Sequence, residues 1–225
     1  KRKAVIGDKA VYDIYPLNKK YYLSTGLGIV VMDGEKYETN DTWIIGNTGN
    51  TVRVNSLTSD ASFFYAATED GLKKASVTAG NLSNYTNWQL LTGSNGLSTG
   101  ACKAVVTVNN KIVVLKNDSL FIQTGNNWNL LYADGWPVIS LNSAGNKLTL
   151  CQRRATGESK VTILNDNGTI ERTMTQPGVI SFPRKAILFN NDYWIADQFG
   201  ALSKFTATNF EVYELNSPES TASGE

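Results

Sequence analysis

A short phrase recurs along the sequence at near-regular intervals, and this repetition constrains the fold more than any other feature. The phrase "YLSTGLGI" at residues 22–29 aligns with "YAATEDGL" at 65–72, which begins 43 residues later. A third copy, "VVLKNDSL" at 113–120, follows after 48 residues, and "WIADQFGA" at 194–201 follows after 81, about two periods. A period of roughly 40 to 48 residues indicates either a propeller or a solenoid.

The content of one period favours the propeller. Residues 103–135, "KAVVTVNNKIVVLKNDSLFIQTGNNWNLLYADG", consist of four apolar runs separated by Asn-Asn, Asn-Asp and Gly-Asn-Asn turns. Such runs predict short strands joined by hairpins. No period carries an amphipathic pattern long enough for a helix of ten residues. We therefore expect an all-β fold, a β-propeller built from four-stranded antiparallel blades.

The repeat predicts five blades in this chain. Residues 218–225 are small and polar and predict a tail or linker. Residues 3–8, "KAVIGD", resemble the end of the first blade, "WIIGN", and predict an orphan outer strand. That strand could close a five-bladed ring. Alternatively, the chain is part of a larger, seven-bladed-type propeller, which we favour because a propeller that is cut open exposes sheet edges. The blades are expected at about 10–46, 50–97, 98–135, 136–178 and 179–217.

Five residues are expected to form the turn between the second and third strands of successive blades. Gly28, Gly71 and Gly200 recur at corresponding positions, and glycine adopts a positive φ without a steric penalty. Asn117 and Asp118 tolerate the same conformation. These are structural positions, and the sequence identifies no ligand-binding residue.

The five tryptophans are interpreted as packing residues between blades. Trp43, Trp88 and Trp128 are expected to open the last strands of their blades, and Trp136 and Trp194 fall elsewhere. Two cysteines, Cys102 and Cys151, lie in apolar runs. They are interpreted as two buried thiols, with a disulfide between them as the alternative.

Composition excludes several classes of function. The chain has 21 basic and 20 acidic side chains, so a nucleic-acid partner, which usually needs a basic face, is not expected. No apolar run is long enough for a transmembrane helix. The sequence begins "KRK" with neither an initiator Met nor an apolar leader, and we take it as a piece of a longer protein.

The sequence also predicts no enzyme, no metal and no cofactor. It contains no histidine, which removes the usual general base, the His-dependent triads and His-ligated zinc. The segment "NDNG" at 165–168 lacks the remaining ligands of a calcium loop. Acid pairs such as Glu69 with Asp70, or Asp192 with Asp197, could support glycoside hydrolysis but are equally typical of solvated loops.

The first 90 residues resemble the amino-terminal propeller of the PorZ family, the sortase-associated propeller proteins of the type IX secretion system in Bacteroidetes. The resemblance rests on "YYLSTGLGIVV", "ETNDTWIIG", "FFYAATEDGLKKAS" and "NLSNYTNWQLL". Beyond them the chain resembles generic blades. Proteins of this family carry two propellers and a small carboxyl-terminal β-domain, and none of their ligand-contacting residues maps here by motif.

The resemblance implies a non-enzymatic binding or scaffold module on the extracellular face of the outer membrane. Its expected partners are other secretion-complex proteins, the sortase among them, or an anionic lipopolysaccharide. The alternative is a periplasmic, oligosaccharide-sensing propeller of a hybrid two-component regulator. A polysaccharide-active enzyme and an unrelated propeller are further alternatives.

Overall fold

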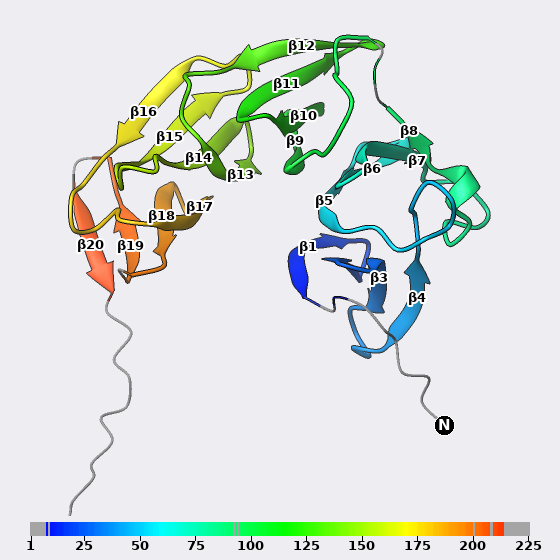
Figure 1. Cartoon of the computed structure of the whole chain (residues 1–225). Coiled ribbons are helices and arrows are strands. Elements are labelled where there is room, and N and C mark those ends of the chain that lie inside the picture. Colours follow the sequence, from blue (N-terminus) through cyan, green and yellow to red (C-terminus); the bar gives the residue numbers. More distant parts are fainter. Residues whose placement is uncertain are drawn as a thin grey trace, which may run out of the picture. The chain divides into compact units, whose positions relative to one another are not determined.

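The computed structural model describes residues 8, 10–91, 93, 95–199, 201–207 and 209–213, and this part of the chain is almost entirely β-structure (Figure 1). Twenty strands form five antiparallel sheets of four strands each. Within each sheet the strands are neighbours in sequence order, as in a propeller blade. The predicted all-β propeller fold is thus confirmed. The chain divides into two compact units, Lys1–Gly135 and Trp136–Glu225.

The first unit holds three blades. The first consists of β1 (Val11–Leu17), β2 (Lys20–Thr25), β3 (Gly28–Asp33) and β4 (Thr39–Trp43). The second consists of β5 (Val54–Ser59), β6 (Phe63–Thr68), β7 (Gly71–Ser76) and β8 (Gln89–Leu90), with the 3-10 helix η1 (Tyr85–Asn87) before β8. The third consists of β9 (Ala104–Val108), β10 (Lys111–Lys116), β11 (Ser119–Thr124) and β12 (Asn127–Tyr132).

The second unit holds two blades. The fourth blade consists of β13 (Val138–Ala144), β14 (Lys147–Arg153), β15 (Ser159–Asn165) and β16 (Ile170–Met174). The fifth consists of β17 (Pro183–Phe189), β18 (Asp192–Asp197), β19 (Leu202–Phe205) and β20 (Phe210–Tyr213). Each of the five ranges predicted from the repeat contains one of these sheets.

The first strands of neighbouring blades lie against each other within each unit. In the first unit β1 contacts β5, and β5 contacts β9; in the second unit β13 contacts β17. Polar side chains join these strands: the hydroxyls of Thr58 and Thr107 are 2.8 Å apart, and the backbone N–H of Val105 donates to Ser56 Oγ at 2.7 Å. Contact between successive first strands is what blades arranged about an axis require.

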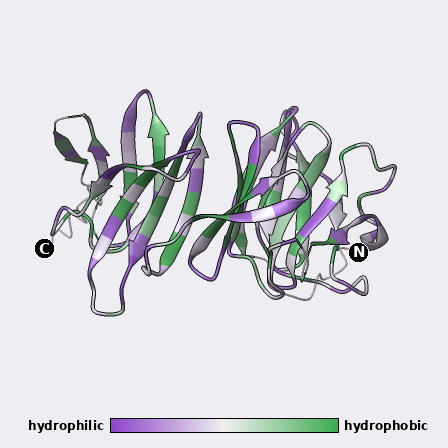
Figure 2. Ribbon diagram, turned by 90° about the horizontal axis from the view of Figure 1, so that it is seen from above, coloured by the Kyte–Doolittle hydropathy of each residue, from purple (hydrophilic) through white to green (hydrophobic). Residues whose placement is uncertain are grey.

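The core of each unit lies between the faces of adjacent sheets. Figure 2 shows apolar residues gathered on the strands and hydrophilic residues in the loops at their ends. Between the first two blades, the ring of Tyr22 lies 5.4 Å from that of Trp43 and 5.3 Å from that of Phe64, measured between centroids. Trp88 lies 6.0 Å from Trp43 in the same cluster. Aromatic pairs at such distances add to the stabilisation that burial of their area provides.

The position of Trp43 differs from the sequence expectation. Trp88 directly precedes β8 and Trp128 is the second residue of β12, as expected, but Trp43 is the last residue of β4. The reason is the turn after β3, in which Asp33 Oδ1 accepts from two backbone N–H groups. This turn places Thr39 opposite Met32. The strand therefore runs from Thr39 and ends at Trp43. All three indoles are buried between sheets, whereas Trp136 and Trp194 are half-buried.

Two lysines are fully buried where blades meet. Lys73 Nζ donates to the carbonyl oxygen of Ile45 at 2.5 Å and to Asn47 Oδ1 at 2.8 Å. Lys116 Nζ donates to the carbonyl oxygens of Gly100 and Ala101 at 2.6 and 2.9 Å. Burial lowers the pKa of Lys73, and the carboxylate of Asp70 opposes that shift. Each ammonium thus satisfies backbone acceptors in the segment that leads from one blade toward the next.

Both cysteines are free and buried, which agrees with the interpretation as two thiols and not with the disulfide. Burial raises the pKa of Cys102 to about 11, with Lys116 opposing the shift, and that of Cys151 to about 12. Thiols with such pKa values carry little thiolate at neutral pH and are unreactive.

Three expectations fall outside the described residues. These are most of the orphan strand at 3–8, the turn residue Gly200, and the polar tail at 218–225. Asp8, the last residue of the expected orphan strand, is described and is not in a strand.

Replacing Lys116 with alanine is expected to lower the free energy of unfolding by about 1–3 kcal/mol, because the buried side chain and its two hydrogen bonds to backbone carbonyl oxygens are lost. Urea denaturation followed by tryptophan fluorescence measures the change. The matched control is Lys103→Ala, which removes a half-exposed ammonium paired with Asp118 at 2.6 Å and should change stability by less than about 1 kcal/mol. Equal effects of the two substitutions would contradict the role given to Lys116.

Candidate functional site

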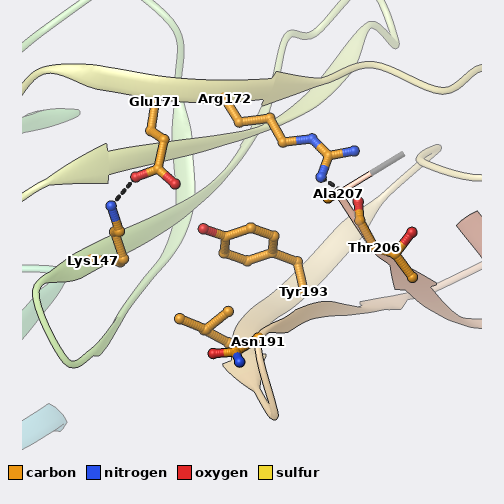
Figure 3. Close-up of a pocket in the computed structure, with 8 residues that line it drawn as sticks. Lys147, Glu171, Arg172, Asn191, Tyr193, Thr206 and Ala207 are labelled. Carbon is orange, nitrogen blue, oxygen red and sulfur yellow. Dashed lines mark hydrogen bonds and ion pairs between the residues drawn. The ribbon is translucent and has the colours of Figure 1, made fainter. Parts of the chain in front are cut away.

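A polar pocket opens at one end of the fourth and fifth blades (Figure 3). Its volume is about 390 Å³. It lies where the start of β14, the strand β16 and the hairpin before β18 come together. The lining residues are Lys147, Glu171, Arg172, Leu188, Asn191, Tyr193, Thr206 and Ala207.

The charged side chains of this pocket are held by hydrogen bonds and an ion pair. Lys147 forms an ion pair with Glu171 and also donates to Asn165 Oδ1 at 2.7 Å. Arg172 donates from its guanidinium to the carbonyl oxygen of Thr206 at 2.6 Å. Glu171 therefore offsets the charge of Lys147, whereas the bonded partner of Arg172 is a neutral carbonyl. The pocket carries one net positive charge at neutral pH.

Tyr193 forms the inner wall of the pocket. Its side chain is buried, and Figure 3 shows the hydroxyl pointing toward the ion pair of Lys147 and Glu171. Burial raises the pKa of Tyr193, the carboxylate of Glu171 raises it further, and Arg172 opposes both effects. The phenol stays protonated at neutral pH, so it can donate a hydrogen bond to a ligand.

These groups suit binding better than covalent chemistry. A protonated phenol, a guanidinium and an amide can hold an oxygen-rich ligand that carries one negative charge. None of them is a histidine or a reactive thiol. Among the described residues, no group of three or more acidic or cysteine side chains could hold a metal ion.

The other end of the same two blades carries a second polar surface, which we call the cationic–aromatic cluster. The guanidinium of Arg154 lies 4.0 Å from the ring centre of Trp136, and Lys160 Nζ lies 4.3 Å from it. The ring of Phe182 lies 4.5 Å from Arg153 and 4.9 Å from Arg184. The cluster is defined by these residues: Trp136, Arg153, Arg154, Lys160, Phe182 and Arg184.

Two acidic side chains also belong to the surroundings of this cluster. Glu158 lies 3.3 Å from Arg154, and Asp197 accepts from the backbone N–H groups of Ser181 and Phe182. Arg154 and Arg184 are exposed, so part of the positive charge is accessible to solvent. Cations held over aromatic rings on a surface suit an anionic ligand, because their positions are fixed before binding.

β14 joins the two surfaces. It begins at Lys147 in the pocket and ends at Arg153 in the cluster, so the two surfaces lie at opposite ends of the strand. Sequence analysis missed both. One signal was present: the turn after β14, residues 154–158, is longer than the two-residue turns of the first three blades and contributes Arg154.

The expected turn residues lie between second and third strands, but in two different roles. Gly28 and Gly71 are the first residues of β3 and β7, with φ of 138° and 133°. Asn117 and Asp118 form the turn itself between β10 and β11, with φ of 49° and 59°. At Gly28 a Cβ atom would lie 2.2 Å from the carbonyl oxygen of Trp43, so glycine is required there.

The acid pairs considered for glycoside hydrolysis do not form a catalytic dyad. Asp192 and Asp197 are the two ends of β18, which at about 3.3 Å per residue puts them roughly 16 Å apart, beyond the separation of either glycosidase class. Glu69 lies 3.8 Å from Arg53, and Asp70 lies 3.5 Å from the buried Lys73. Glu69 and Asp70 thus each have a cationic partner.

Comparison with known families identifies the amino-terminal part of the chain. Residues 1–89 match the family model "TSS9, PorZ, N-terminal beta-propeller domain". The resemblance found in the sequence is confirmed over this range. No curated protein sequence matches the chain significantly.

Solved structures share the fold at low sequence identity. PorZ of Porphyromonas gingivalis, described as an essential bacterial surface component of the type-IX secretion system, aligns with a TM-score of 0.70 and 15% identity over 92% of this chain. The extracellular domain of a hybrid two-component system protein from B. thetaiotaomicron aligns with a TM-score of 0.67 and 12% identity over 96%. BamB from Moraxella catarrhalis aligns with a TM-score of 0.57 and 13% identity over 89%.

The chain spans only part of each of these proteins: 26% of the PorZ chain, 30% of the two-component protein and 58% of BamB. In the described part of the chain, no helix has the length and apolarity needed to cross a membrane.

Glu171→Gln is expected to lower the pKa of Tyr193, because the carboxylate that disfavours the phenolate is removed while burial remains. The pKa can be measured by NMR titration of ring-labelled tyrosine. Since folding raises this pKa, the contribution of Tyr193 to stability is fully present below its unfolded pKa of about 10 and is lost as the pH rises through the folded value. In the variant that loss should begin at lower pH.

The control is Glu211→Gln, which removes the carboxylate that hydrogen-bonds Tyr213 at 2.6 Å. It should lower the pKa of Tyr213 and leave that of Tyr193 unchanged. A pKa of Tyr193 that is insensitive to Glu171→Gln would contradict the geometry of the pocket.

Proposed function

We propose that this chain is a non-enzymatic binding and scaffold propeller of a type IX secretion attachment complex on the surface of a Bacteroidetes cell. The observation that carries the proposal is the match of residues 1–89 to the PorZ amino-terminal propeller family. Rigid sheets that present loops at their ends are suited to recognition. The complex, with its sortase, supplies the protein partners in this proposal.

The ligand that we propose for this chain is an anionic lipopolysaccharide, held at the cationic–aromatic cluster. The residues of the cluster support an anion, since four cations gather around two aromatic rings there although the whole chain has a formal charge of only +1. Phosphate or carboxylate groups on a glycan accept hydrogen bonds from guanidinium groups in a fixed geometry. Arg154 and Arg184, both exposed, are the residues expected to make first contact.

The double substitution Arg154→Gln with Arg184→Gln is expected to weaken binding of purified anionic lipopolysaccharide roughly three- to tenfold, because two solvent-accessible charge contacts are lost. Binding to lipopolysaccharide immobilised on a sensor surface, measured at two salt concentrations, tests this. The wild-type affinity should fall as salt rises. The matched control is Lys20→Gln with Lys36→Gln, which removes two exposed positive charges from the first blade.

Two results would count against the proposal. If the control weakens binding as much as the cluster variant, net charge and not the cluster governs the interaction. If the folded chain binds no anionic lipopolysaccharide and recovers no sortase-complex protein from a Bacteroidetes envelope extract, the secretion role is wrong.

A further inference from the structure

Trp88 and Trp128 occupy corresponding places in the second and third blades, but their indole groups differ in hydrogen bonding. Both side chains are buried, at 6% and 5% exposure. The indole N–H of Trp88 donates to the carbonyl oxygen of Leu82 at 3.0 Å. The indole N–H of Trp128 donates to no group in the described part of the chain. A nearly buried donor is therefore left open in the third blade.

The difference follows from the lengths of the two hairpins. In the second blade, residues 77–88 separate β7 from β8, and this long connection brings the Leu82 carbonyl to the indole. In the third blade, β11 and β12 are joined by the two residues Gly125 and Asn126. In so short a turn, no backbone carbonyl oxygen accepts a hydrogen bond from the indole N–H of Trp128.

A pocket of about 250 Å³ is lined in part by Trp128. Its walls come from β7 and β8 of the second blade and from the hairpin between β11 and β12 of the third. The backbone N–H of Trp128 donates to the carbonyl oxygen of Asn95 at 2.6 Å, which fixes the two blades to each other beside the pocket. The lining residues are Lys74, Gln89, Leu91, Asn95, Gln123, Asn126 and Trp128.

The polar groups of the pocket are mostly amides. Gln123 donates to the carbonyl oxygen of Gly125 at 3.2 Å, whereas the side chains of Gln89, Asn95 and Asn126 make no hydrogen bond within the described residues. Lys74 Nζ lies 3.7 Å above the ring of Phe63 and supplies a further donor. Each amide is both a donor and an acceptor, so a matching ligand must offer both.

We propose that this pocket binds one sugar residue of a glycan. Sugar hydroxyls donate and accept hydrogen bonds, as the amides do, and a sugar oxygen would accept from the Trp128 indole where Leu82 accepts from Trp88. The volume is below the roughly 300–1,000 Å³ of pockets for drug-sized ligands, which suits a single ring. The pocket lies in the first unit, so the inference stands apart from the lipopolysaccharide site proposed for the cationic–aromatic cluster in the second.

Nitrogen-15 NMR of the whole chain tests this inference, because each of the five tryptophans gives its own indole resonance. The probes are glucose, galactose, mannose, N-acetylglucosamine and glucuronate, each titrated into the millimolar range. At least one is expected to shift the Trp128 indole resonance saturably and to leave that of Trp88 unchanged. No saturable shift of Trp128 with any of the five sugars, or a shift produced instead by an unrelated short peptide, overturns the proposal.

Substitutions of exposed residues locate the binding without disturbing the core. Gln89→Ala and Asn126→Ala are each expected to weaken sugar binding about tenfold, the size of one hydrogen bond lost with its partner. The matched control is Gln198→Ala, an exposed amide in the second unit, which should bind as the wild type does. If both pocket variants bind as the wild type does, the proposal is wrong.

The double variant Arg154→Gln with Arg184→Gln separates this inference from the proposed function. It should keep the full Trp128 response to sugar whatever happens to lipopolysaccharide binding. A loss of the sugar response in that variant would place the sugar at the cluster and overturn the assignment to the pocket.

Discussion

Face-to-face packing of adjacent sheets is the interaction on which the rest of the structure depends. A single four-stranded sheet here has apolar residues on both faces, and neither face is satisfied until another sheet covers it. Between the first two blades this cover is aromatic: the ring centroids of Trp43 and Phe64 lie 5.5 Å apart across the junction. Lys73 and Lys116 are buried where blades meet, and each donates to a backbone carbonyl oxygen there.

Packing also explains why the two ends of the blades can carry different kinds of side chain. The strands of the fourth and fifth blades are fixed by a shared apolar core that includes Cys151, Ile163 and Ile195. Their ends face solvent and are free of that constraint. One end accordingly holds an ion pair and a buried phenol, and the other holds guanidinium groups over aromatic rings. The same scaffold thus presents two unlike surfaces at the two ends of its strands.

The repeat and the turn chemistry were enough to predict the fold, because a blade is a local structure. Asn117 and Asp118 join strands that are adjacent in sequence, and their preference for positive φ is intrinsic. The site was not predictable in the same way. Arg172 and Tyr193 belong to different blades and meet only through the way those blades pack. Trp43 was misplaced within its strand because Asp33, a residue ten positions away, sets the register. The open indole of Trp128 could have been found by comparing hairpin lengths between periods.

The strictly consecutive strand order has a consequence for how the chain acquires its structure. Every strand pairs with the strand just before or after it, so most closures span a short loop and cost little chain entropy. Strand pairing within a blade can therefore begin as soon as its own residues leave the ribosome, and packing of the next blade then covers its exposed apolar face. Order of emergence and order of assembly would then coincide, with the amino-terminal sheets seeding those that follow.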